Sequence, residues 1–263
     1  MKIDFAARVE IGERETNDDR VLIDGQILDR NSHTGTLELP AIAVVCDGCG
    51  GYLGGGIAAQ TVLETLATEE AEDLTDASYL AQVLDQCELD VNYKKSQMPQ
   101  FSKMCTTIAG CVFYEKGMLI FHSGDSRVYR HDRWGIAQMT IDHSYVQNLV
   151  DRGEISPEEA LTHPERNVIT RCIGNNGKAP EIYVSGATIL PEEKYLFCSD
   201  GLWESVSEKQ IRGILDSELS LEQMTDTLVE LALHQGSDDN ISVCIFQGQG
   251  KSEVVERTPF ILD

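Results

Sequence analysis

The sequence predicts an α+β fold in which helices pack over largely antiparallel sheets. Strand-like apolar runs and helix-like segments occur in separate blocks along the chain. Consecutive strand-like runs are joined by short turns such as Glu115-Lys116 and Gly124-Asp125, which is typical of antiparallel hairpins. Helices that come in blocks, rather than between every pair of strands, favour α+β over a parallel α/β sheet.

Strands and helices can be placed from the spacing of apolar residues. Helical repeats at intervals of three and four residues cover 77–91 and 221–231. Capping signatures predict further helix starts at Ser156, Ser207 and Ser220. We expect strands at residues 3–9, 20–24, 41–46, 105–114, 117–123, 126–131, 194–199 and 241–247.

No repeat, low-complexity block or linker divides the 263 residues. At 41% apolar and 25% charged residues the composition is globular. The sequence therefore predicts a single domain over residues 1–250, followed by a short C-terminal tail at 251–263.

The net charge of the chain excludes some classes of binding partner. The chain has 44 Asp and Glu against 21 Lys and Arg, a formal net charge of −23. Such an acidic surface repels DNA, RNA and anionic membranes, so none of these is expected as a partner. The longest uncharged run, residues 104–114, is about half of a membrane span, and the N-terminus has no signal-peptide pattern. We expect a cytoplasmic protein.

The eight cysteines do not resemble a disulfide framework. The spacing Cys46-x-x-Cys49 could form a redox pair or half of a zinc site, but no second such motif completes a tetrahedral set. Most cysteines lie within apolar runs, where a free thiol behaves as a small hydrophobe. These are Cys46, Cys105, Cys111, Cys172, Cys198 and Cys244.

Acidic turns adjoin four of the predicted strands. Asp47, Asp125 and Asp200 come directly after or between strand-like runs, and Asp239 directly precedes one. Each turn alone is explained by the frequency of Asp-Gly and Asp-Asn in turns. Four such turns, in a chain that also carries Asn17-Asp18-Asp19, predict that the carboxylates converge at one edge of a sheet.

Converging carboxylates must protonate, separate or bind cations. Oxygen ligands favour Mg²⁺ or Mn²⁺ over zinc. Two such ions can activate a water and neutralise a phosphoryl oxygen. Arg14, three residues before Asn17, supplies a planar guanidinium suited to a phosphate.

Six segments, in order along most of the chain, resemble motifs of the metal-dependent protein phosphatase family, the type 2C Ser/Thr phosphatases. The lack of further domains makes the chain similar to the compact bacterial members. The segments are GERETNDD (12–19), VCDGCGG (45–51), GDSR (124–127), DHS (142–144), SDGLW (199–203) and DNIS (239–242).

This resemblance implies a four-layer α-β-β-α sandwich, two mainly antiparallel sheets flanked by helix pairs, with a flap at about 140–180. It also implies hydrolysis of phosphomonoesters on Ser/Thr phosphoproteins by a water bridged between two Mn²⁺ or Mg²⁺ ions. By the same resemblance, Asp47 bridges the two metals, the Gly48 carbonyl binds the first, and Asp200 and Asp239 bind the second.

The remaining roles come from the same resemblance. Arg14 holds the phosphate, and Asp18 or Asp19 orients the attacking water. Asp125, with Asp200, contributes to a third metal position found in bacterial relatives. Further expected features are a cognate Ser/Thr kinase as a partner and a monomeric state.

The sequence departs from the family pattern at several positions. The first acidic motif is Asp18-Asp19 where the family usually has Glu-Asp, and Cys49 stands where many eukaryotic members have a His. The glycine run 54–56 suggests a flexible segment. His122 is expected to be a satisfied core histidine, and His143 to make a structural or flap contact.

Two alternative functions remain open from the residues alone. A catalytically weak or inactive regulatory module could retain the fold, although it would be expected to lose part of the metal set. A two-metal phosphodiesterase or nuclease would also use carboxylates, but it would need a basic groove.

Overall fold

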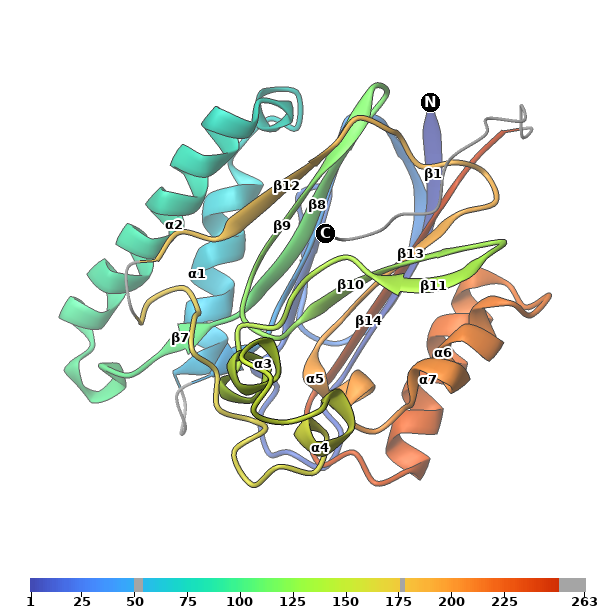
Figure 1. Ribbon diagram of the computed structural model, residues 1–263. Helices are drawn as coiled ribbons and strands as arrows, with labels where there is room; N and C mark the ends of the chain where they lie inside the picture. Colours follow the sequence, from blue (N-terminus) through green and yellow to red (C-terminus); the bar gives the residue numbers. More distant parts are fainter. Residues whose placement is uncertain (50–53, 176–177, 251–263) are drawn as a thin grey trace.

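Two six-stranded antiparallel sheets lie face to face, with helices on their outer faces (Figure 1). The computed structural model describes residues 1–49, 54–175 and 178–250. This arrangement confirms the predicted four-layer α-β-β-α sandwich. The predicted tail, 251–263, lies outside the described residues, and the single-domain boundary at 250 stays a prediction.

The first sheet has the strand order β11-β10-β13-β14-β1-β4. Its central pair is β13 with β14, in which Tyr195 lies opposite Phe246. Its strands are β1 (Lys2–Glu10), β4 (Asn31–Glu38), β10 (Arg127–Asp132), β11 (Gly135–Gln138), β13 (Lys194–Cys198) and β14 (Ile241–Gly248).

The second sheet has the order β12-β9-β8-β5-β2-β3. A separate short ladder joins β6 (Gly48–Cys49) to β7 (Cys105–Thr106). The strands of the second sheet are β2 (Arg20–Ile23), β3 (Gln26–Leu28), β5 (Ala41–Cys46), β8 (Ile108–Tyr114), β9 (Gly117–Ser123) and β12 (Glu181–Ser185).

Helix pairs cover the two outer faces. Helices α1 (Gly55–Ala67) and α2 (Ala77–Gln97) lie on the second sheet, and α6 (Glu208–Leu215) and α7 (Leu221–His234) lie on the first (Figure 1). The shorter elements are α3 (Tyr145–Asp151), α4 (Pro157–Ala160), α5 (Asp200–Trp203), η1 (Asp73–Thr75) and η2 (Pro99–Phe101).

Strand β5 shows why the sequence gives a sandwich with two outer layers. All its residues are buried, and successive side chains point to opposite faces of the sheet. Ala43 and Val45 belong to the core between the sheets, whereas Ile42, Val44 and Cys46 pack under α1 and α2. An entirely apolar strand of this kind requires cover on both faces.

The predicted strands and the helices at 77–91 and 221–231 are confirmed, with one correction. The predicted strand 105–114 is interrupted at Thr107, between β7 and β8. There the backbone turns aside to bond the segment after β5: the Thr107 N–H donates to the Asp47 carbonyl at 2.8 Å. Helix α1 and the edge strand β4 were not predicted; β4 is mostly exposed and lacks an apolar run.

The glycine run 54–56 is not a flexible segment. Gly54 caps α1, and Gly55 and Gly56 form its buried first turn. A Cβ on Gly55 would lie 2.2 Å from the Gly48 carbonyl oxygen, and one on Gly56 would lie 2.9 Å from Asp18 Oδ1. These glycines therefore let a helix start in direct backbone contact with β6.

We predict that Gly55→Ala destabilises the protein by about 1–3 kcal/mol, because the new methyl group overlaps backbone atoms that have no room to move. The matched control is Gly213→Ala in α6, where an added Cβ meets no atom within 4 Å. That change should raise stability by up to about 1 kcal/mol through helix propensity. Urea denaturation measures both, and equal stability of the two variants would contradict the close approach of α1 and β6.

Candidate metal and phosphate site

The predicted carboxylates converge at one end of the sandwich. Asp47 follows β5, Asp200 follows β13, Asp239 precedes β14, Asp125 lies between β9 and β10, and Asp19 precedes β2. Burial raises the pKa of Asp47 well above its usual value, and the charges of the other four carboxylates raise it further. Segments distant in sequence thus place five acidic groups within electrostatic reach of one another.

The pKa values of two further carboxylates in this cluster are raised as well. The pKa of Asp200 is also raised well above its usual value, by burial and then by Asp125, Asp239 and Asp19. The pKa of Asp125 is raised to about 7, chiefly by burial and by Asp142. Among the described residues, the Oδ1 atoms of Asp125 and Asp200 are buried without a hydrogen-bond partner.

These unpartnered oxygens are potential ligands for divalent cations. Buried carboxylates normally have hydrogen bonds, counter-ions or metals as partners. Here the potential donors are carboxylate oxygens whose like charges raise one another's pKa, and carboxylate oxygen is the ligand type that Mg²⁺ and Mn²⁺ prefer. The residues present fit such ions.

The backbone at Asp47 is held from three directions. Its N–H donates to Thr107 Oγ1 at 3.0 Å, and its carbonyl accepts from the Thr107 N–H and from Thr106 Oγ1. The Gly48 N–H donates to the Asp18 carbonyl at 3.3 Å, and Gly55 packs against the Gly48 carbonyl. The residues after β5 are thus fixed before any ligand binds.

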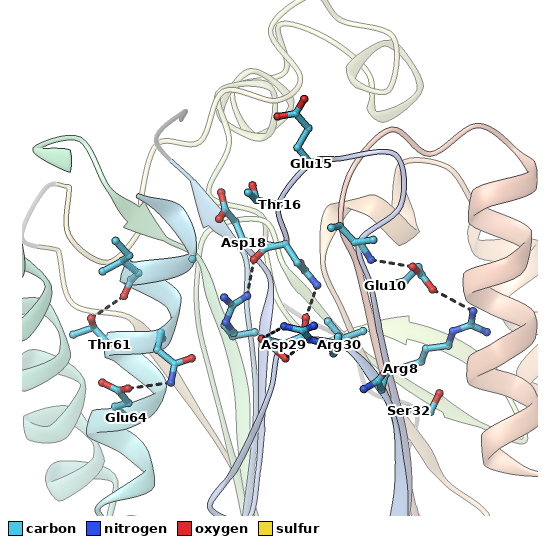
Figure 2. Close-up of a pocket in the computed structure, with 18 of the residues that line it drawn as sticks. Arg8, Glu10, Glu15, Thr16, Asp18, Asp29, Arg30, Ser32, Thr61 and Glu64 are labelled. Carbon is cyan, nitrogen blue, oxygen red and sulfur yellow. Dashed lines mark hydrogen bonds and ion pairs between the residues drawn. The ribbon is translucent and has the colours of Figure 1, made fainter. Parts of the chain in front are cut away.

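The structure separates the two acidic residues that the sequence left as alternatives. Asp19 is 1% exposed and accepts a 2.7 Å hydrogen bond from Ser199 Oγ, and burial raises its pKa to about 7. It belongs to the carboxylate cluster. Asp18 instead lines a cavity of about 1010 Å³ (Figure 2).

This cavity lies beside the cluster, between the two helical layers. In Figure 2, Asp18 and Thr16 lie toward the upper end of the cavity, and the exposed ion pair of Asp29 and Arg30 lies below them. Arg20 also lines it, and its guanidinium donates to the carbonyls of Asn17 and Asp19. The wall is polar and of mixed charge.

Arg14 lies at the edge of the cluster, on the side of Asp239. Its Nε donates to the Asp238 carbonyl at 2.6 Å, and its Nη2 pairs with Asp239 Oδ2 at 2.9 Å. The Arg14 side chain is 51% exposed and that of Asp239 is 36% exposed. Arg14 is therefore accessible to a phosphate, but it is already linked to one of the predicted metal ligands.

Asn240 is a positioning residue to which sequence reasoning assigned no role. Its side-chain amide donates to the carbonyls of Ile11 and Thr16, and its Oδ1 accepts from the Asp18 N–H. This buried side chain ties the loop that carries Arg14 to the start of β14. The sequence places Asp239-Asn240 directly before a strand, and this position could have indicated a role for Asn240 as well as for Asp239.

The two histidines support the turn at Asp125. His122 is 7% exposed and bonds through Nε2 to the Ile141 backbone, which confirms it as a satisfied core histidine. His143 stacks on it at 4.7 Å, and its Nδ1 accepts from the Gly124 N–H. Burial lowers the pKa of His143 to about 4, so the ring is neutral and suited to this structural contact.

No protein family model matches the chain. It is 32% identical over 213 residues to the serine/threonine phosphatase Stp of Listeria monocytogenes, covering 78% of this chain and 84% of that protein. It is 33% identical over 223 residues to a putative protein phosphatase 2C-type of Streptococcus pyogenes, covering 82% and 88%. The chain belongs to the bacterial type 2C serine/threonine phosphatases.

Solved structures agree with this membership. The Mycobacterium tuberculosis phosphatase PstP superposes with a TM-score of 0.82 at 28% identity, covering 94% of this chain and 99% of that one. A second structure, of the PstP catalytic domain in complex with two manganese ions, superposes at 0.78 and 28% identity, covering 94% and 98%. The chain is thus a Ser/Thr phosphoprotein phosphatase, and nothing in the described part of its site favours the inactive alternative.

None of the helices in residues 1–49, 54–175 and 178–250 is both long enough and apolar enough to cross a bilayer.

We predict that Asp200→Asn raises the Tm of the metal-free phosphatase by a few degrees, equivalent to about 1 kcal/mol, because it removes one of several mutually repelling buried charges. The same change should abolish most of the Mn²⁺-induced rise in Tm. The matched control is the exposed Asp85→Asn in α2, which should change neither value. A metal-free Asp200→Asn protein less stable than wild type would contradict the charge repulsion.

Proposed function

We propose that Asp47, the Gly48 carbonyl, Asp200 and Asp239 hold two divalent cations, Mn²⁺ or Mg²⁺, and that Asp125 with Asp200 forms a third, weaker position. The observation that carries this proposal is the pair of buried carboxylate oxygens without partners inside a cluster of five carboxylates. The two manganese ions in the PstP complex support the same choice of metal.

When bound, such cations polarise a phosphoryl oxygen and make water a better nucleophile. The protein's own groups supply position and proton transfer. Asp19, oriented by Ser199 Oγ, would accept a hydrogen bond or a proton from the attacking water. Asp18 faces the cavity and borders the bound substrate.

Arg14 receives the phosphoryl group in this proposal. Its exposed guanidinium lies at the cluster, and the Asn240 hydrogen bonds fix the loop that carries it. Its pairing with Asp239 connects phosphate binding to the ligand set, because both interactions use the same guanidinium. This contact was not expected from the sequence.

The substrates we infer are proteins phosphorylated on Ser or Thr, whose flanking residues lie along the polar cavity. A cognate Ser/Thr kinase would supply these phosphoproteins. We further propose a monomeric, cytoplasmic phosphatase that acts without nucleic acid or membrane partners, in keeping with its net charge of −23.

We expect turnover of p-nitrophenyl phosphate and of phospho-Ser and phospho-Thr peptides to depend on added Mn²⁺ or Mg²⁺ and to cease in EDTA. The physical reason is that the charges with the largest effect on Asp47 are those of the other four carboxylates, which require cations to neutralise them. Restoring Mn²⁺ should restore the rate. Full activity of the chelated protein would point to a metal-independent mechanism.

Asp47→Asn and Arg14→Ala should separate metal binding from phosphate binding. Asp47→Asn should greatly weaken Mn²⁺ binding and abolish turnover. Arg14→Ala should lower kcat/KM roughly 10- to 150-fold, the equivalent of losing about 1.5–3 kcal/mol of charge-assisted hydrogen bonding.

Mn²⁺ titration calorimetry beside phosphopeptide kinetics measures both effects. Because Arg14 pairs with Asp239, its removal should shift Mn²⁺ affinity less than tenfold, in line with the small free energy of exposed ion pairs. Equal loss of Mn²⁺ binding in the two variants, or wild-type kinetics for Arg14→Ala, would show that Arg14 does not bind the phosphate.

A further inference from the structure

Three thiols meet beside the phosphatase site. The sulfur atoms of Cys49, Cys105 and Cys172 all lie within 4.8 Å of one another, and the Cys49 and Cys105 sulfurs are 3.0 Å apart. The C-x-x-C motif of the sequence is not the relevant pair, because Cys46 is buried in the core under α1 and α2. Cys105 and Cys172, interpreted from the sequence as small hydrophobes, are the actual neighbours of Cys49.

The backbone brings these thiols together through specific contacts. Cys49 and Cys105 are directly opposite each other in the β6–β7 ladder. The next residues, Thr106 and Ile173, form an antiparallel bridge with hydrogen bonds of 3.1 and 2.9 Å, which places Cys172 against the same ladder. Three segments of the chain thus supply one thiol each.

Helix α2 holds the third segment in place. The Gly174 N–H donates to Glu88 Oε2 at 2.5 Å, and Lys95 Nζ donates to the Gly174 carbonyl. A side chain on Gly174 would collide with Val91 of the same helix. Hydrogen bonds from Cys172 and Cys49 lower the pKa of the Cys105 thiol, and the same contacts with Cys105 raise the pKa of the other two thiols.

The spacing suits a tetrahedral thiophilic ion. Zinc–sulfur bonds of about 2.3 Å place tetrahedral sulfur ligands roughly 3.8 Å apart. All three sulfur atoms lie within 4.8 Å of one another, so small side-chain movements from the 3.0 Å separation of Cys49 and Cys105 would bring them to one ion. A disulfide would use two thiols and leave the third unexplained, whereas a metal uses all three.

We propose that Cys49, Cys105 and Cys172 form a second metal site, distinct from the carboxylate cluster, that binds Zn²⁺. No other Cys, His, Asp or Glu among the described residues joins the group, so a solvent molecule completes the tetrahedron. Cys105 and Cys172 are 7% and 2% exposed, while Cys49 is half-buried and provides the opening through which the ion enters. Bound zinc cross-links β6, β7 and the segment around residue 172.

The test uses the full-length phosphatase, fully reduced and with saturating Mg²⁺, so that the carboxylate cluster is occupied. Co²⁺ added as a zinc substitute should give an intense thiolate-to-cobalt absorption band at one equivalent, and Zn²⁺ should abolish it. Elemental analysis of protein purified without chelators should find one zinc, which a mercurial reagent for thiols releases.

Cys49→Ser, Cys105→Ser and Cys172→Ser should each weaken Co²⁺ and Zn²⁺ binding more than about tenfold. The matched control is Cys87→Ala in α2, a buried thiol outside the cluster, which should bind as wild type does. Thermal unfolding shows whether each variant folds. If a variant does not fold, the cobalt spectrum of the wild-type protein decides whether the three thiols bind the metal. The proposal is overturned by a wild type without the thiolate band, by zinc binding unchanged in the three serine variants, or by a Cys49–Cys105 disulfide forming in place of metal binding.

Discussion

The repulsion among five carboxylates, all of them buried or partly buried, is the constraint on which the rest of the structure depends. Asp19, Asp47, Asp125, Asp200 and Asp239 are collected at one end of the sandwich, and burial and mutual charge raise the pKa of the most enclosed of them. Such a cluster opposes folding until cations neutralise it. The core between the sheets and the two cores under the helices must therefore supply the stability that the site removes.

Neutral hydrogen bonds hold the cluster in position without adding charge to it. Ser199 Oγ donates to Asp19, and Thr106 and Thr107 clamp the backbone at Asp47. Asn240 ties the Arg14 loop to β14. These groups fix the acidic residues in the absence of metal, so that binding a cation requires little rearrangement, which is how a preorganised site limits the cost of binding.

Local sequence pattern predicted the features that local physics determines. Apolar runs located β5 and β14, and helical spacing located α2 and α7, because their burial imposes a period of two or 3.6 residues. The acidic turns at strand ends located the carboxylate cluster. Helix α1 was missed because glycines occupy its N-cap and first turn, where they do not predict a helix. They are needed because α1 starts in contact with the backbone of β6, and sequence pattern does not show that these two segments meet. The Arg14–Asp239 pair and the three-thiol cluster were missed for the same reason, since their partners are distant in sequence.

The adjacency of oxygen and sulfur donors has a chemical consequence for the phosphatase. Gly48 belongs to the proposed Mn²⁺ or Mg²⁺ site and Cys49, the next residue, to the proposed zinc site. At a given site with oxygen ligands, zinc binds more tightly than manganese and would displace it. Thiolate ligands prefer zinc, whereas carboxylates suit the harder ions. Three thiolates beside the catalytic cluster therefore give zinc a stronger alternative within the same protein, and the carboxylates remain available to the ions that suit phosphoryl transfer.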